Sequence, residues 1–85
     1  MHKHFSSVGF DEYVYWQTED RKTLKRINLL IQDIERNGPM NGIGKPERLK
    51  YIDGWSRRID EVNRLVYSTG DNAIIIYSCK DHYND

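Results

Sequence analysis

The spacing of apolar residues near the start of the chain predicts a short helix over residues 7–18. Phe10, Tyr13 and Val14 recur at the interval that places side chains on one side of a helix. Ser7 is suited to cap its first turn, and Phe5 precedes it in a segment that we expect to form a short strand.

A second and longer helix is predicted directly after the first. Asp20 can cap its start, and Asn37-Gly38-Pro39 ends it, because Asn or Gly accepts the left-handed cap conformation and Pro cannot continue a helix. Its apolar stripe is the most regular in the sequence and consists of Leu24, Ile27, Ile31 and Ile34.

The hydrophobic period changes to two after a turn-rich linker over residues 39–46. Four strands are expected, with a turn at Gly70-Asp71-Asn72 before the last: residues 47–52, 55–59, 62–69 and 73–80. Two helices followed by successive short strands predict an α+β fold. We expect the two N-terminal helices to pack on one face of a small, mainly antiparallel β-sheet, with residues 1–85 as a single domain.

Composition excludes several classes of protein. Aromatic residues make up 12% of the chain and the formal net charge is zero, which is unlike a disordered segment. The longest wholly apolar run, residues 73–77, is far shorter than the roughly 20 residues that span a bilayer. A single cysteine, Cys79, cannot form an internal disulfide, and no secretory signal follows Met1. We therefore expect a cytoplasmic protein with no membrane association.

The zero net charge conceals an uneven distribution. Between Arg21 and Arg64, eleven basic residues face six acidic ones, and the two ends of the chain carry the compensating negative charge. A basic middle of this kind suits the binding of a polyanion, and it equally suits an ordinary solvated surface.

Polar residues on the predicted strands are the candidates for chemistry. A carboxylate, an imidazole and several cations lie on different strands or strand ends, where folding can bring them together: Glu47, Lys50, Arg58, Arg64 and His82. Such a set can move protons and stabilise the charge on a phosphate, so that RNA is cleaved by its own 2′-OH with no metal or other cofactor.

Each candidate also has an ordinary structural interpretation. Glu47 can pair with a neighbouring lysine at the surface, Arg64 can lie at the end of a strand, and a histidine near a chain end is often without a role. Arg57 and Arg58 point to opposite faces of a regular strand, so at most one belongs to a given site. Cys79 suits a buried filler, and no histidine has a partner at zinc-ligand spacing, so we predict no metal site.

Taken in order, several segments match a known family. They are Tyr13-Val14-Tyr15-Trp16-Gln17, Lys25-Arg26-Ile27-Asn28, Gly42-Ile43-Gly44-Lys45-Pro46-Glu47, Trp55-Ser56-Arg57-Arg58-Ile59, Asn63-Arg64-Leu65-Val66-Tyr67 and Lys80-Asp81-His82-Tyr83. The chain closely resembles the YoeB/Txe toxins of the RelE-like toxin superfamily over residues 10–83. Ordered blocks at these separations are far more specific than any single motif.

The resemblance implies a ribosome-dependent endoribonuclease that cuts messenger RNA and stops translation. Glu47 matches the general base, Arg64 the arginine at the scissile phosphate, and His82 the general acid. Tyr83 matches a terminal tyrosine that orients the substrate. The residues expected to bind RNA or its phosphates are Lys50 and Arg58, with Arg57 and Lys45 beside them.

The resemblance also implies partners. A YefM-type antitoxin would wrap the toxin, the ribosome and its messenger RNA would be the working partners, and operator DNA would be contacted only through the antitoxin. Members of this branch also form homodimers.

The sequence departs from the family pattern at several points. The net charge is zero where relatives are basic, Asn63 stands where the family usually has a histidine, and Asn84 and Asp85 follow Tyr83. These departures leave an alternative function open, in which the chain is a catalytically weak module that binds ribosomes or antitoxin on the same scaffold.

Overall fold

Residues 1–82 are described by a computed structural model, in which a short strand precedes two helices and four further strands follow them. The elements are β1 (His2–Phe5), α1 (Ser7–Glu19), α2 (Arg21–Asn37), β2 (Glu47–Arg48), β3 (Trp55–Arg58), β4 (Arg64–Gly70) and β5 (Ala73–Ser78). The predicted order of helices and strands is confirmed. Residues 83–85, and with them the role expected of Tyr83, lie outside the described part of the chain.

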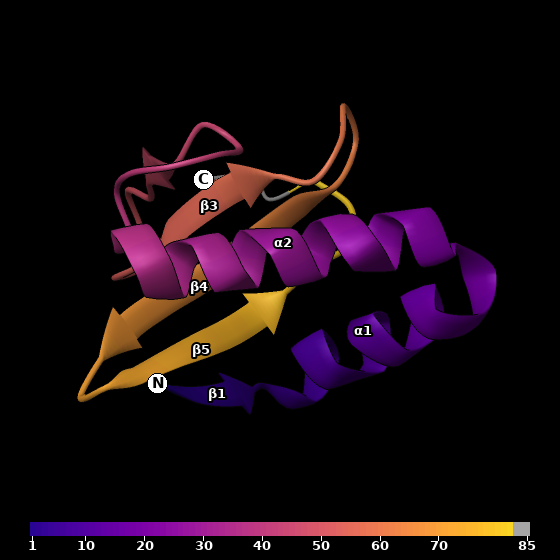
Figure 1. Cartoon of the computed structure of the whole chain (residues 1–85), viewed down its shortest axis with the longest axis horizontal. Coiled ribbons are helices and arrows are strands. Elements are labelled where there is room, and N and C mark those ends of the chain that lie inside the picture. The colour runs from indigo at the N-terminus through magenta and orange to yellow at the C-terminus, as the bar shows by residue number, and fades with distance from the viewer. Residues whose placement is uncertain (83–85) are drawn as a thin grey trace.

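The five strands form one sheet in the order β1-β5-β4-β3-β2. Strands β2 to β5 pair antiparallel with their neighbours, whereas β1 pairs parallel with β5, with Phe5 opposite Ile76. The sheet is therefore mixed, although mainly antiparallel as expected. Helix α2 lies across one face of it, and α1 runs beside β1 and β5 (Figure 1).

Helix α2 supplies one side of the core. Asp20 caps it by accepting from the backbone N–H groups of Lys22 and Thr23, and Gly38 ends it at a φ of 85°. The predicted stripe is confirmed, because Ile27, Ile31 and Ile34 are buried and Leu24 packs against the core. They meet apolar residues of the sheet, among them Leu65, Tyr67, Ile74 and Ile76. Within residues 1–82, no helix is both long and apolar enough to cross a bilayer.

The buried side of α1 differs from the prediction. Phe10 and Val14 are exposed, and Trp16 is the aromatic residue that enters the core, with Tyr13 partly buried beside it. The indole of Trp16 donates to the carbonyl of Cys79, 2.9 Å away, which turns the helix toward β5. Ser6 rather than Ser7 is the N-cap, because the Ser6 hydroxyl accepts from the backbone N–H of Gly9.

The strands are shorter than expected at one edge of the sheet. The segment predicted as a strand over residues 47–52 keeps only two paired residues, because the chain turns back toward β3 after Arg48. The guanidinium of Arg48 bonds to Asp53 and to the carbonyl of Gly54, and it stacks over the ring of Trp55. These contacts hold a very short β2 against β3.

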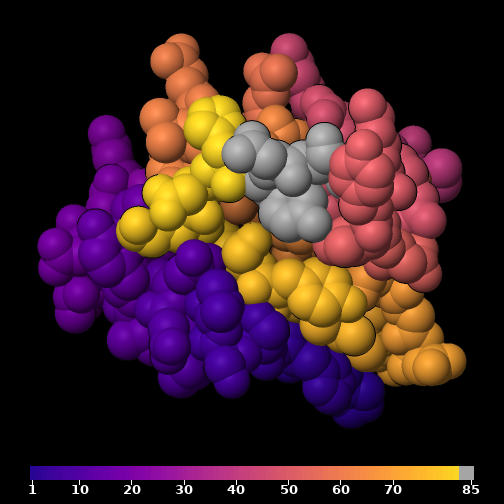
Figure 2. Space-filling view, turned by 180° about the vertical axis from the view of Figure 1, so that it is seen from behind, coloured from indigo at the N-terminus to yellow at the C-terminus, as the bar shows by residue number. Residues whose placement is uncertain are grey.

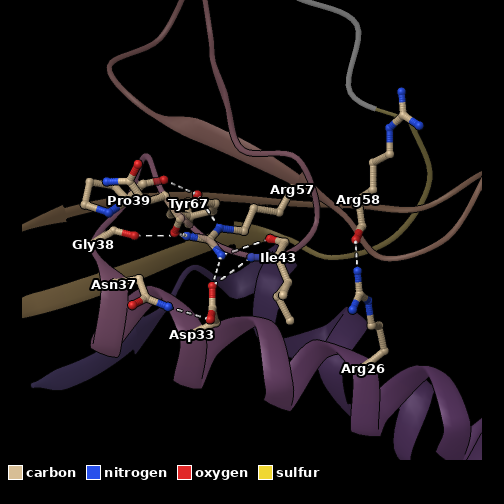
Figure 3. A network of polar contacts seen from close by, with 10 residues as sticks. Arg26, Asp33, Asn37, Gly38, Pro39, Ile43, Arg57, Arg58 and Tyr67 are labelled. Atoms are coloured by element: carbon tan, nitrogen blue, oxygen red, sulfur yellow. Dashed lines mark hydrogen bonds and ion pairs between the residues drawn. The ribbon is translucent and has the colours of Figure 1, made fainter.

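A fully buried arginine organises the linker between α2 and β2. The side chain of Arg57 has no solvent exposure and points toward α2 (Figure 3). Its guanidinium pairs with Asp33 at 2.6 Å, and its other donors go to the Tyr67 hydroxyl and to the carbonyls of Gly38, Asn41 and Ile43. Residues 38–44 are thereby fastened to the sheet just before Glu47.

Candidate functional site

Figure 2 views the molecule from the side opposite to that of Figure 1, in which α2 lies in front of the sheet. Several of the predicted polar residues lie on the face of the sheet opposite α2. Because Arg57 points toward α2, its neighbours Ser56 and Arg58 point to the opposite face. Glu47 pairs directly with Ser56, and Arg58 with Arg64, and residues opposite one another in a sheet share a face. The strand register therefore brings Glu47, Arg58 and Arg64 together from three strands.

Two adjoining hollows lie on this face and share Arg64 and His82. The larger has a volume of about 310 Å³ and is lined by Glu47, Arg48, Leu49, Lys50, Ser56, Arg64 and His82. The smaller has a volume of about 200 Å³ and is lined by Arg58, Asp60, Glu61, Arg64 and His82. A carboxylate, an imidazole and several cations thus converge in one place.

Arg64 lies at the centre of the site. Its Nε donates to the Ser56 hydroxyl at 3.0 Å, which fixes the plane of the guanidinium. Its Nη2 lies 3.7 Å from a Glu47 carboxylate oxygen, too far for a hydrogen bond. Within the part of the chain that the structure describes, this buried Nη2 has no hydrogen-bond partner. The site therefore presents an unused cationic donor beside a half-exposed carboxylate.

His82 reaches the site from the chain segment after β5. The residue before it, Asp81, accepts a hydrogen bond at its carbonyl from the backbone N–H of Arg64, and its own N–H donates to the side chain of Asn63. The C-terminal segment is thus held against the start of β4, and His82 lines both hollows.

Of the other predicted residues that the structure describes, two line a hollow and two do not. Lys50 lines the larger hollow and Arg58 the smaller one, with its side chain pointing away from α2 (Figure 3). Lys45 is exposed on the linker and lines neither hollow. Arg57 is on the opposite face with its guanidinium fully engaged, so we leave it out of the candidate site. The two arginines lie on opposite faces of the sheet, as the alternation along the strand predicted.

Five residues that line the hollows are not among the candidates predicted from the sequence: Arg48, Leu49, Ser56, Asp60 and Glu61. Ser56 orients Arg64, and Asp60 and Glu61 add negative charge to the smaller hollow. Partial burial acts to raise the pKa of Asp60, but hydrogen bonds from Asn63 and Val62 outweigh it and hold that pKa below its usual value. The Asp60 carboxylate closes the turn between β3 and β4. The sequence signal for such a turn is Asp60 itself, because an aspartate side chain commonly accepts hydrogen bonds from backbone N–H groups two or three residues further along the chain.

The donor set does not match a metal centre. Within residues 1–82, no three side chains of His, Cys, Asp or Glu converge to bind an ion. In the larger hollow three cationic side chains accompany one carboxylate, which suits an anionic ligand, whereas two arginines and two carboxylates line the smaller one.

The fold recurs in bacterial toxins of known structure. The chain superimposes on the YoeB dimer from Staphylococcus aureus with a TM-score of 0.93 and 48% identity, over 98% of both chains. It matches the toxin in the heterotetrameric YoeB-YefM complex from the same species with a TM-score of 0.91, 48% identity and the same coverage. The class is therefore that of toxins from type II toxin–antitoxin systems.

Sequence comparison narrows the class to one family. The family model of the YoeB-like toxins of bacterial type II toxin–antitoxin systems matches residues 5–83. Toxin YoeB of Streptomyces coelicolor is 51% identical over 81 residues, which cover 93% of this chain and 95% of that protein. Toxin YoeB of Escherichia coli K12 is 47% identical over 81 residues, which again cover 93% of this chain and 95% of that protein. The chain belongs to the YoeB-like toxin family, as the resemblance of its motifs predicted.

Proposed function

We propose that this toxin is a ribosome-dependent endoribonuclease that cleaves messenger RNA and thereby inhibits translation. The observation that carries the proposal is the buried Nη2 of Arg64, which lies 3.7 Å from the Glu47 carboxylate and has no hydrogen-bond partner within residues 1–82. Arg64 also lines both hollows together with His82. A buried cationic donor is costly to leave unsatisfied, and a phosphate oxygen is the acceptor that suits it.

The residues around Arg64 suit cleavage by the RNA's own 2′-OH. The Glu47 carboxylate takes the proton of the 2′-OH, and the 2′-oxygen attacks the adjacent phosphorus. The new bond joins the 2′-oxygen to phosphorus, and the bond from phosphorus to the 5′-oxygen breaks. His82 gives its proton to that departing oxygen, while Arg64 stabilises the charge on the phosphorane oxygens. The step leaves a 2′,3′-cyclic phosphate and a free 5′-OH, and it requires no metal.

The cations at the edge of the site would hold the RNA backbone. Lys50 and Arg58 line the two hollows on either side of Arg64, and Lys45 is exposed on the linker that leads to Glu47. Contacts of this kind position the phosphates and carry no sequence information. Tyr83, which follows His82, is proposed to orient the nucleotide at the cleaved bond.

The family suggests the partners. The related S. aureus toxin forms a heterotetramer with YefM and also a dimer. We infer that this chain likewise pairs with a YefM-type antitoxin and forms a homodimer, and that operator DNA is contacted only through the antitoxin. Because translating ribosomes are the working partner, the toxin would act in the cytoplasm.

The test is primer extension on a messenger translated in a purified system, with and without ribosomes. Wild-type protein should produce new messenger ends only with ribosomes. Glu47→Gln and His82→Ala should each lower the cleavage rate by about 10²–10⁴-fold, the range for loss of a general base or acid. Asn28→Ala is a matched control, because Asn28 contacts Tyr13 between the helices, away from the site. Cleavage that survives both site variants would refute the proposal. Ribosome association without cleavage would instead support a binding module.

A further inference from the structure

The loop between β3 and β4 is folded around one carboxylate. Oδ1 of Asp60 accepts from the backbone N–H groups of Val62 at 2.8 Å and Asn63 at 2.7 Å. The backbone N–H of Ile59 also donates to the carbonyl of Asn63 at 3.0 Å. The turn therefore holds Asn63 in a defined place at the start of β4, next to Arg64.

The side-chain amide of Asn63 connects this turn to the distant C-terminal segment. Its Nδ2 donates to the Asp60 carboxylate, at 3.0 Å from Oδ2 and 3.3 Å from Oδ1. Its Oδ1 accepts from the backbone N–H of Asp81 at 2.7 Å, across 18 positions of sequence. Both ends of the amide are thus used, one on each segment.

Asp81 is held in an unfavourable backbone conformation. Its φ is 66°, in the left-handed region that non-glycine residues rarely adopt, so the conformation persists only where other contacts impose it. Two hydrogen bonds hold its peptide groups, one from its N–H to Asn63 and one from the N–H of Arg64 to its carbonyl at 3.2 Å. The next residue is His82, which lines both hollows with Arg64.

We propose that Asn63 is a positioning residue for His82. It acts through the backbone of Asp81 and touches no reacting atom, and the role rests on the function proposed above for His82. The amide is suited to this task because it donates to a carboxylate on one side and accepts from an N–H on the other without adding charge. A carboxylate at this position would keep the acceptor but face Asp60 with like charge. Asn63, which stands where the family usually has a histidine, thus connects the turn at Asp60 to the backbone of Asp81.

Three substitutions separate the two halves of the bridge. Asn63→Ala removes both, and Asn63→Asp keeps the acceptor for Asp81 but loses the donors to Asp60. Asn63→His restores a donor and an acceptor on opposite sides of the ring. Asn28→Ala, which removes an amide bonded to the Tyr13 hydroxyl at 2.7 Å, is the matched control.

Two measurements are made on each variant. The first is hydrogen exchange at the Asp81 amide by NMR, with the amides of β4 and β5 as the reference for global stability. The second is the maximal rate of messenger cleavage on ribosomes and the toxin concentration at half that rate. A loss of positioning lowers the maximal rate, whereas weaker binding raises the concentration required.

We expect Asn63→Ala to expose the Asp81 amide to exchange while β4 and β5 stay protected. Its maximal rate should fall about 10- to 100-fold, the scale for a misplaced catalytic group, with the half-saturating concentration unchanged. Asn63→Asp should be intermediate, Asn63→His should recover most of the rate, and Asn28→Ala should match wild type.

Several outcomes would overturn the role of Asn63. One is full cleavage by Asn63→Ala despite rapid exchange at Asp81, and another is equal loss of rate in Asn28→Ala. A third is loss of rate with exchange faster throughout β4 and β5 and no recovery in Asn63→His, which is general unfolding. Cleavage that depends on His82 but not on Asn63 overturns this role alone. Cleavage that survives His82→Ala overturns the proposed function as well.

Discussion

Nη1 of Arg57 lies 2.6 Å from Oδ2 of Asp33, and the arginine of this ion pair has no solvent exposure. Each remaining donor of the guanidinium also has a partner, so the buried cation is fully satisfied (Figure 3). The adjacent arginine, Arg58, projects from the other face of the sheet. Two neighbouring arginines thus serve different purposes, one in the fold and one in the candidate site.

Removing the buried cation should strongly destabilise the toxin. We expect Arg57→Leu to lower the free energy of unfolding by about 3–5 kcal/mol, because the partly buried Asp33 loses its cation and the carbonyls that Arg57 bonds lose their donor. Arg58→Ala, at an exposed position, should change it by less than about 0.5 kcal/mol. Equilibrium denaturation of both variants is the measurement. Equal stability of the two variants would contradict the structural role of Arg57.

The glycine at position 42 should be required by the same network. Its φ is 121°, and a Cβ there would collide with the Asp33 carboxylate that holds Arg57. We expect Gly42→Ala to cost about 1–3 kcal/mol of stability from backbone strain, with further loss if the ion pair opens. Gly70→Ala is the control, since a Cβ at Gly70 meets nothing within 4 Å. Thermal melting compares them, and similar midpoints would count against this explanation of the glycine.

The stability contributed by Asp33 should be lost in acid. The hydrogen bond from Arg57 holds the pKa of Asp33 below its usual 3.8, against a smaller opposing effect of burial. A lowered pKa in the folded state stabilises the protein above the unfolded value, and this contribution disappears as the pH falls through the folded value. The stability difference between wild type and Asp33→Asn should therefore be constant from pH 7 to about 5 and shrink below about 4. Urea denaturation across this range measures it. A difference that grows as the pH falls would contradict the assignment.

The single thiol should be unreactive in the folded toxin. Burial, with a smaller effect of the Glu12 carboxylate, raises the pKa of Cys79 to about 12. At pH 8 very little thiolate is present, so alkylation by iodoacetamide should be about a thousandfold slower than in denaturant. Mass spectrometry of labelled protein gives both rates. Rapid labelling of folded protein, with the remaining structure intact, would show that the thiol is accessible.

Local signals made much of the fold predictable. Helix α2 follows from an Asp20 cap, a Gly38 stop and a regular stripe between them, all of which act within one element. The buried side of α1 was not predictable in this way, because Phe10 and Val14 compete with Trp16 for the core. The choice is decided by the contact of Trp16 with Cys79, 63 positions later.

The candidate site shows the same division. Alternation along a strand predicted that the side chains of Arg57 and Arg58 point to opposite faces of the sheet. Which of the two is buried depends on the face that α2 covers, and the strand pattern does not reveal this. The motif blocks singled out Glu47, Arg64 and His82, whose convergence depends on the register of three strands and on the turn at Asp81. The sequence shows Asn63 only as a replacement of the family's usual histidine. Its contact with Asp81 joins residues far apart in the chain, so local sequence patterns do not predict it.

The most direct test of the account uses a messenger with one 2′-deoxynucleotide at the site of cleavage on the ribosome. If Glu47, Arg64 and His82 cleave RNA through its own 2′-OH, wild-type toxin should cut the all-ribose messenger there and leave the 2′-deoxy messenger intact at that position. Equal cleavage of both messengers would mean that the nucleophile is not the 2′-OH, and it would contradict the mechanism proposed for this site.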